Sequence, residues 1–152
     1  MSDLGRILLA EDSEADVELT LAALAHHNLA NEVVVVRDGA EALDYLLRRG
    51  AFSGRGPGLP AVVLLDLKMP RVDGLEVLRT IKADEQLRKL PVVMLTSSRE
   101  ERDLVESYRL GVNAYVVKPV DFSQFVEAVK QLGMFWAVIN EPPPGTVAGR
   151  PR

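Results

Sequence analysis

Short apolar runs alternate with amphipathic stretches five times along the chain. The runs occupy residues 7–10, 33–36, 62–65, 92–95 and 114–117. Continuous aliphatic runs of this length are typical of strands buried on both faces of a sheet, and the stretches between them carry apolar residues at helical spacing. This alternation predicts an α/β fold, a doubly wound five-stranded parallel sheet with five helices on its two faces.

Each predicted helix begins with a residue that can cap its free backbone N–H groups. The caps and the polar side chains three positions later form the pairs Ser13–Asp16, Asp38–Glu41, Asp73–Glu76, Ser98–Glu101 and Asp121–Gln124. This spacing is typical of helix N-termini. We expect the second helix to end at Gly50 and the fourth near Gly111. Residues 51–60, with three glycines and two prolines, are expected to form an exposed loop.

Polar side chains follow the predicted strands at their carboxyl ends. Asp66 directly follows the run 62–65, and Pro70 prevents the strand from continuing. We expect Asp66 to be held at the rim of the sheet and to be partly open to solvent. The other polar side chains are Glu11 and Asp12 after the first strand, Thr96 after the fourth and Lys118 after the fifth. Doubly wound sheets bind ligands at this edge, where the strand order reverses.

Three carboxylates at one edge of a sheet favour a bound cation. Two unit charges a few ångströms apart repel by about 4 kcal/mol at an effective dielectric constant of about 20. A hard divalent ion such as Mg²⁺ relieves this repulsion and also binds phosphate oxygens. With the Lys118 ammonium and the Thr96 hydroxyl, the site suits phosphoryl transfer. Asp66 is then the natural nucleophile, forming an acyl phosphate.

Composition narrows the classes of function. Of the 152 residues, 47% are hydrophobic and 26% are charged, and the net charge is −4 with no dense basic cluster. We expect one globular domain in residues 1–140, with no nucleic acid as a partner. The sequence shows no signal peptide, no membrane-length apolar run and no cysteine, so we expect a cytoplasmic protein without membrane contact. Residues 141–152 are rich in Pro and Gly and are predicted to form a flexible tail.

The polar residues at the strand ends match the pattern of a known family. Glu11-Asp12, Asp66 with Met69-Pro70 and Asp73-Gly74, Thr96-Ser97, and Tyr115 with Lys118-Pro119 together resemble a response-regulator receiver domain of the chemotaxis type. The resemblance covers about residues 5–133. It implies a flavodoxin-like fold with strand order 2-1-3-4-5. It also implies a two-component signalling protein that acts by protein–protein contact or by phosphorelay.

The same resemblance implies a role for each site residue. Asp66 would accept a phosphoryl group from a sensor histidine kinase. Asp12 and Asp66 would bind Mg²⁺ or Mn²⁺ together with the main-chain carbonyl of Lys68, while Glu11 would act through water.

The resemblance also implies how the site responds to phosphorylation. Thr96 would bond a phosphoryl oxygen, Tyr115 would swing inward behind it, and Lys118 would neutralise charge. The Lys118–Pro119 peptide bond is expected to be cis.

Two further features resemble the single-domain regulators that are paired with bacterial phytochromes. They are the long Gly/Pro loop before the third strand and the aromatic pair Phe135-Trp136 with the residues 140–143 that follow it. This implies a bacteriophytochrome as the kinase.

One position departs from the receiver pattern. Receiver domains often carry Asn where this chain has Lys68. By the resemblance, the side chains of Lys68 and Ser98 flank the path of the water that attacks the phosphoryl group. We therefore predict that these two residues set its lifetime, although Lys68 could instead be a solvated loop lysine.

Two other classes of protein fit parts of the sequence. A flavin-binding flavodoxin-like domain would need a Ser/Thr/Gly-rich phosphate cradle, and the carboxylates would repel its ligand. A phosphatase with an aspartyl nucleophile would need a second acid where Lys68 stands. No output domain is apparent after the fifth helix. We therefore expect a phosphorylation-controlled binding module with no enzymatic activity beyond its own Mg²⁺-dependent phosphorylation and dephosphorylation.

The last apolar stretch predicts a homodimer. The fifth helix already directs one apolar stripe at the core, through Phe122, Phe125, Val126, Val129 and Leu132. A second run of apolar side chains follows, formed by Met134, Phe135, Trp136, Val138 and Ile139. A helix cannot turn all of them toward one small domain, so some would face a second copy of the chain. In the alternative, residues 142–144 fold the segment back over its own domain.

Overall fold

Five short strands form the centre of the computed structural model, which describes residues 6–25, 32–56, 58–112 and 114–131. The strands are β1 (Ile7–Ala10), β2 (Val33–Val36), β3 (Val62–Asp66), β4 (Val92–Thr96) and β5 (Ala114–Val117). The helices are α1 (Glu14–Leu24), α2 (Gly39–Leu47), η3 (Gly50–Phe52, a 3₁₀ turn), α3 (Gly74–Ala83), α4 (Arg99–Ser107) and α5 (Phe122–Gln131).

The strands pair in the order β2-β1-β3-β4-β5, and every pair is parallel. Ile7 of β1 pairs with Val33 on one side and with Val62 on the other. The order reverses between β1 and β3, so the carboxyl ends of these two strands flank the crevice where such sheets bind ligands. The predicted α/β class and the strand order implied by the resemblance are both confirmed.

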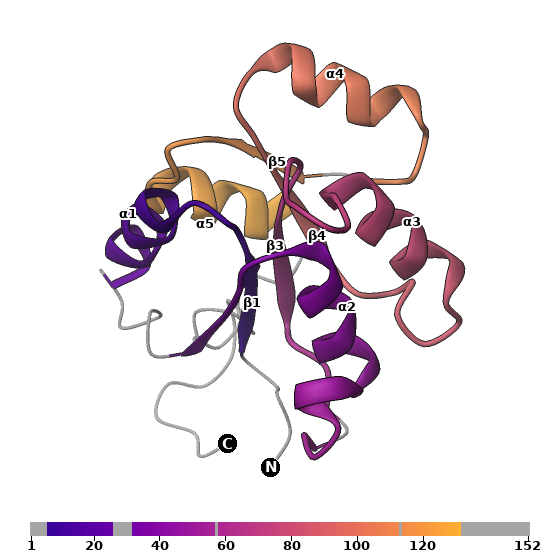
Figure 1. Cartoon of the computed structure of the whole chain (residues 1–152). Helices are drawn as coiled ribbons and strands as arrows, with labels where there is room; N and C mark the ends of the chain where they lie inside the picture. The colour runs from indigo at the N-terminus through magenta and orange to yellow at the C-terminus, as the bar shows by residue number, and fades with distance from the viewer. Residues whose placement is uncertain (1–5, 26–31, 57, 113, 132–152) are drawn as a thin grey trace, which may run out of the picture.

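Helices cover both faces of the sheet (Figure 1). On one face α1 and α5 pack against Ile7, Leu9 and Leu64, with Phe125 of α5 fully buried. On the other face α2, α3 and α4 contribute to the second core, where Leu8 faces the side chains of these helices. Successive strand residues thus point into different cores, which explains why each strand is apolar up to its carboxyl end, where β3 ends in Asp66 and β4 in Thr96.

The predicted N-caps are present on all five helices. Each cap side chain accepts a hydrogen bond from the backbone N–H three positions on. The distances are 3.2 Å for Ser13–Asp16, 2.7 Å for Asp38–Glu41, 2.9 Å for Asp73–Glu76, 3.3 Å for Ser98–Glu101 and 2.8 Å for Asp121–Gln124. Local sequence therefore determines where each helix begins.

Two predicted helix ends were wrong. The second helix ends at Leu47 rather than Gly50, because Arg48 adopts the left-handed conformation with φ 55° and its N–H bonds back into the helix. Gly50 instead starts η3. The fourth helix ends at Ser107, ahead of Gly111, and Arg109 takes the left-handed conformation there with φ 52°. In both cases an arginine is the first residue after the helix with positive φ, and the predicted glycine, at φ 58° for Gly50 and 81° for Gly111, follows two positions later.

Residues 51–60 are not simply an exposed loop. The guanidinium of Arg55 lies 4.3 Å from the centre of the Tyr45 ring, and its Nε donates to the Tyr45 carbonyl at 2.9 Å. Phe52 meets the same ring edge-on, with 5.0 Å between centroids. The loop is therefore anchored on α2, and Pro60 is buried where the chain enters β3.

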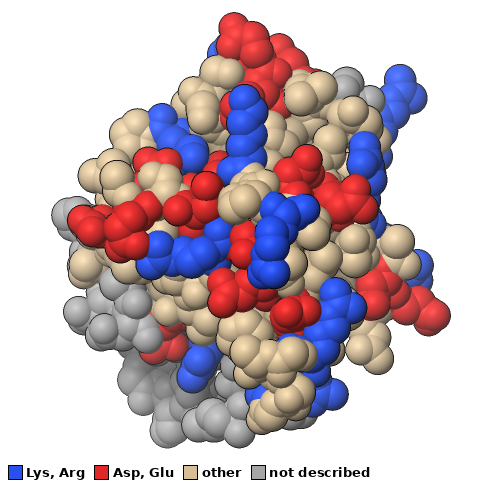
Figure 2. Space-filling model, in the orientation of Figure 1, with Lys and Arg blue, Asp and Glu red and all other residues tan. Residues whose placement is uncertain are grey.

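The predicted continuation of the fifth helix, the dimer residues and the tail at 141–152 lie outside the described residues. Among the described residues, no helix is both long and apolar enough to cross a membrane. Acidic and basic side chains are interspersed over the face seen in Figure 2.

Candidate functional site

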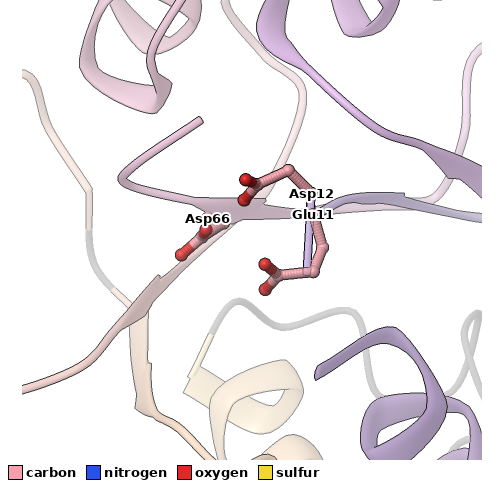
Figure 3. Close-up of side chains that lie close together, drawn as sticks. All are labelled: Glu11, Asp12 and Asp66. Atoms are coloured by element: carbon pink, nitrogen blue, oxygen red, sulfur yellow. The ribbon is translucent and has the colours of Figure 1, made fainter. Parts of the chain in front are cut away.

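Three carboxylates meet at the carboxyl edge of the sheet (Figure 3). Glu11 and Asp12 directly follow β1, and Asp66 is the last residue of β3. One oxygen from each lies within 4.8 Å of the other two. Glu11 is fully buried, Asp12 is exposed, and Asp66 is only 4% exposed. The expectation that Asp66 is partly open to solvent was therefore wrong.

The first turn of α3 packs closely against the backbone of Asp66. The Gly74 N–H donates to the Leu67 carbonyl at 2.8 Å, which folds the β3–α3 loop back onto the strand end. A Cβ atom at Gly74 would lie 2.1 Å from the Asp66 carbonyl oxygen. Only glycine permits this approach, so the helix closes over Asp66 from one side.

Lys118 directly follows β5, the strand at the edge of the sheet, and its side chain reaches into the carboxylate cluster. Its backbone N–H donates to the Thr96 carbonyl at 2.8 Å, which aligns the end of β5 with that of β4. Its Nζ lies 3.1 Å from Asp66 Oδ1, 3.3 Å from Glu11 Oε1 and 3.0 Å from Asp16 Oδ2. The Lys118–Pro119 peptide bond is cis, as expected.

Asp16 also belongs to the site, although the sequence predicted it only as a polar residue in the first turn of α1. It lies four residues before Thr20 and eight before Leu24, and both of these side chains are buried. Residues at this spacing share one face of a helix. The inward direction of Asp16 could therefore have been read from the sequence, but its contact with Lys118 depends on how α1 and β5 pack together.

The ionisable groups of the site shift one another's pKa values. Burial first and the charge of Asp66 second raise the pKa of Glu11 to about 7, although Lys118 opposes this. Burial also raises the pKa of Asp66, and hydrogen bonding to Lys118 offsets part of the effect. Burial alone would lower the pKa of Lys118, but hydrogen bonds to Asp16 and Asp66 outweigh it and raise the pKa. Lys118 therefore stays protonated near neutral pH.

Thr96, the last residue of β4, carries a hydroxyl without a partner. Thr96 is fully buried, and within the described residues its Oγ1 has no hydrogen-bond partner. The strand pairing places its neighbour Leu95 opposite Asp66. An unsatisfied buried hydroxyl costs about 1–3 kcal/mol. An acceptor oxygen bound beside Asp66 would remove that cost.

Tyr115 lies between the sheet and α4. It pairs with Met94 in the β4–β5 ladder, and the guanidinium of Arg102 lies 4.9 Å from the centre of its ring. Burial first and the charge of Glu106 second raise the pKa of Tyr115. The ring is partly exposed beneath Arg102, so α4 holds Tyr115 in its present position.

Lys68 and Ser98 contact the first turn of α4 rather than the carboxylate cluster. The Lys68 side chain is 79% exposed, and its Nζ lies 3.3 Å from Glu101 Oε2. Glu101 also accepts a hydrogen bond from the Ser97 N–H at 2.8 Å. Ser98 caps the same helix. The site as a whole offers hard carboxylate oxygens, which suit a divalent cation of the Mg²⁺ or Mn²⁺ kind.

Comparison with known proteins agrees with this geometry. The family model described as response regulator receiver domain matches residues 7–130. The probable methanogenesis regulatory protein FilR2 of Methanothrix harundinacea is 41% identical over 90% of this chain and 86% of its own. The response regulator Rcp1 of Synechocystis is 38% identical over 86% of this chain and 87% of its own.

Solved structures give the same result. The bacteriophytochrome response regulator RtBRR superposes with a TM-score of 0.84 and is 65% identical, covering 93% of this chain and 86% of its own. The phosphorylated cyanobacterial phytochrome response regulator RcpA gives 0.68 at 44% identity, over 86% and 92% of the two chains. The Mn²⁺-bound form of Rcp1 gives 0.67 at 38% identity, over 86% and 93%. The chain belongs to the response-regulator receiver domain family.

Proposed function

We propose that Asp66 is the phosphoacceptor of this receiver domain and that a sensor histidine kinase supplies the phosphoryl group. One observation carries the proposal: Asp66 ends the central strand with Lys118 Nζ 3.1 Å from its Oδ1 and the acid pair of β1 beside it. The flavin and phosphatase alternatives lose support. The edge of the sheet offers carboxylates where a flavin phosphate would bind, and Lys68 stands where such a phosphatase needs an acid.

The chemistry follows from these contacts. A carboxylate oxygen of Asp66 forms a bond to phosphorus while the bond between phosphorus and the donor histidine nitrogen breaks, and the electron pair of that bond leaves on the imidazole. The Lys118 ammonium lies where it can bind a negatively charged oxygen of the phosphoryl group as that group is transferred to Asp66. The hydroxyl of Thr96 donates to a second phosphoryl oxygen and gains the partner that it lacks within the described structure.

The carboxylates fit a divalent cation. Asp12 and Asp66 would hold Mg²⁺ or Mn²⁺ directly with the main-chain carbonyl of Lys68, and Glu11 would contact it through water. The bound ion supplies positive charge to the phosphoryl oxygens. The Mn²⁺-bound structure of the relative Rcp1 supports a metal of this class.

Thr96 and Tyr115 would carry the response outward. When the Thr96 hydroxyl moves toward the phosphoryl group, space opens behind it that the Tyr115 ring can enter. The ring would then leave its place beneath Arg102 of α4. The phosphoryl group can drive this change only through contacts that differ between the two states.

The partners and setting follow from the relatives. The similarity to RtBRR and RcpA, which are response regulators of phytochromes, supports a bacteriophytochrome as the kinase. The proposed location is the cytoplasm. The proposed organisation is a receiver domain over residues 1–140, a flexible tail at 141–152 and a homodimer. The proposed activity is limited to Mg²⁺-dependent self-phosphorylation and dephosphorylation.

The test uses the full chain with Mg²⁺ and acetyl phosphate, read out as added phosphoryl groups by intact mass spectrometry. Wild type is expected to gain one group and Asp66→Asn none. Asp12→Ala is expected to lose Mg²⁺ binding because one of two coordinating carboxylates is gone. Asp103→Asn, an exposed aspartate on α4, serves as the control and is expected to label normally. Labelling of Asp66→Asn to the wild-type level would show that the assignment is wrong.

A further inference from the structure

All three donors of the Lys118 ammonium are engaged. An ammonium group has three N–H donors and no acceptor. Lys118 Nζ lies 3.0 Å from Asp16 Oδ2, 3.1 Å from Asp66 Oδ1 and 3.3 Å from Glu11 Oε1. Phosphorylation converts the Asp66 carboxylate into an uncharged acyl group, so the donor that faces Asp66 Oδ1 is free to turn to a phosphoryl oxygen, while Glu11 and Asp16 still hold the ammonium in its present place.

The three carboxylates differ in what they lose when the ammonium leaves. The side chain of Glu11 is 1% exposed and that of Asp66 is 5% exposed, so neither can recover its hydration by turning to solvent. The side chain of Asp16 is 30% exposed. A carboxylate that water can reach pays the smallest desolvation penalty when its cation moves away. Of the two partners that remain when Asp66 is phosphorylated, Asp16 is thus the one that Lys118 can release more easily.

A closed ring of contacts holds Asp16 in position. The Ser13 N–H donates to Glu11 Oε2 at 3.2 Å, and the Asp16 N–H donates to Ser13 Oγ at 3.2 Å. Lys118 completes the ring by contacting both Glu11 and Asp16. The cap of α1 therefore fixes the Asp16 carboxylate beside the ammonium, unlike a long surface side chain that pairs by chance.

We propose that Asp16 is a positioning residue that holds the Lys118 ammonium in the unphosphorylated protein and competes with the phosphoryl group for it. The phosphoryl group draws the ammonium toward its oxygens, through the donor that faced Asp66, and so weakens the contact with Asp16. Asp16 therefore weakens the phosphorylated state, and its release reports that state to the first turn of α1. The inference rests on the proposed function of Asp66 as the phosphoacceptor.

The test measures how tightly the full chain binds beryllofluoride in the presence of Mg²⁺, by titration followed with ¹⁹F NMR. Beryllofluoride stands in for the phosphoryl group on Asp66. Asp16→Asn removes the competing charge at nearly constant shape and is expected to tighten binding roughly two- to fivefold, the range of one partly exposed ion pair. Glu14→Gln is the matched control. Glu14 lies in the same turn of α1 but pairs with Arg37, so affinity should stay at the wild-type value.

A double-mutant cycle separates this role from a general change in the electric field. In a Lys118→Met background, Asp16→Asn should no longer tighten binding, because its effect passes through the ammonium. Asp16→Glu keeps the charge and should restore wild-type affinity. Asp16→Ala provides a second uncharged variant, and thermal unfolding checks that each variant is folded.

Each outcome is decisive. Tighter binding that depends on Lys118 supports the inference. Wild-type affinity in folded Asp16→Asn and Asp16→Ala overturns it, and so does a gain that persists without Lys118. If wild type itself fails to bind beryllofluoride, the proposed role of Asp66 fails, and the inference fails with it.

Discussion

Glu11 has a raised pKa that lies close to neutral pH. It is fully buried, and burial together with the charge of Asp66 raises its pKa from 4.5 to about 7. Between these two values the folded protein holds a proton that the unfolded chain has released. The free energy of unfolding of the metal-free protein should therefore decrease as pH rises through this window, because the folded state binds more protons there.

Metal binding should expel that proton. We expect the affinity for Mg²⁺ to fall by up to about tenfold per pH unit below pH 7. The reason is that a protonated, neutral Glu11 attracts a nearby cation less strongly than its carboxylate does. Calorimetry in two buffers of different ionisation enthalpy would measure the released proton. Glu11→Gln should release none and should show a flatter pH dependence. An equal proton release in wild type and Glu11→Gln would contradict the assignment to Glu11.

Lys68 and Ser98 are predicted to set the lifetime of the phosphoryl group. Lys68 is paired with Glu101 in this state, yet its exposed chain is long enough to turn toward a phosphoryl oxygen and obstruct the attacking water. Lys68→Asn is expected to shorten the lifetime several-fold while changing stability by less than about 1 kcal/mol. Ser98→Glu adds bulk beside the same path and is expected to lengthen it. Dephosphorylation is followed by mass spectrometry after removal of the phosphodonor.

Lys89→Asn provides the control for Lys68. Lys89 is an exposed lysine between α3 and β4, at the opposite edge of the sheet, and its loss should leave the lifetime unchanged. If Lys68→Asn and Ser98→Glu also dephosphorylate at the wild-type rate, neither residue tunes the reaction.

At the scale of elements, two glycines let helices approach the β3–α3 loop. A Cβ at Gly39, the first residue of α2, would lie 1.8 Å from the Val72 carbonyl oxygen, and one at Gly74 would lie 2.1 Å from that of Asp66. Backbone atoms cannot rotate away as a flexible side chain can. The first turns of α2 and α3 therefore fix the β3–α3 loop, which begins directly after Asp66 and contains Lys68.

Gly74→Ala should separate α3 from the end of β3. We expect a loss of roughly 2–3 kcal/mol or more in the free energy of unfolding, measured by urea denaturation, because the added methyl overlaps the backbone. Gly54→Ala is the matched control. A Cβ at Gly54 meets nothing within 4 Å, so its effect should stay within about 0.5 kcal/mol. Equal stability of the two variants would mean that the loop can shift without cost.

The elements differ in how well the sequence predicted them. Strand positions and helix starts were predictable, because an aliphatic run and a cap followed three residues later by a polar side chain act over a few residues. The convergence of Glu11, Asp66 and Lys118 was predictable as well, because parallel strands present their carboxyl ends at one edge. Each of these features depends on local sequence or on topology alone.

Other features depend on packing and could not be predicted. Arg55 looks like a polar loop residue, yet its guanidinium stacks on Tyr45 of α2 and anchors the loop before β3. The burial of Asp66 depends on how the strand ends and the Lys118 side chain pack around it, and a sequence does not encode such distances. Arg48 takes a left-handed conformation that glycine would have been expected to supply.

Across the whole molecule, ion pairs connect the phosphoacceptor loop to helices on both sides. Arg71, which follows Pro70, makes two contacts of 3.0 Å with Asp38 at the start of α2. Lys68 reaches Glu101 at the start of α4. A change at Asp66 therefore has direct routes to α2 and α4, in addition to the route through Tyr115.

The predicted homodimer concerns the surface of the whole molecule. Phe125 and Val129 of α5 are fully buried against the sheet, so the core-facing side of this helix is already occupied. The predicted contact residues Met134, Phe135, Trp136, Val138 and Ile139 follow it in the sequence, outside the described residues. Tyr108, directly after α4, and Val117 of β5 are 46% and 41% exposed, so apolar side chains also reach the surface at the ends of these two elements. Exposed apolar groups of this kind are typical of partner surfaces.

Light scattering across a dilution series should show a dimer, because one apolar surface that meets its own copy about a twofold axis buries these aromatic side chains in both chains. Phe135→Asp or Trp136→Ala should shift the equilibrium toward monomer. Leu19→Asp, at an exposed leucine of α1, is the control and should leave the dimer intact. The proposed dimer includes the face of α4 and β5 on which the Tyr115 switch would act, so beryllofluoride is expected to alter the dissociation constant. A monomer at high micromolar concentration, with and without beryllofluoride, would exclude the dimer.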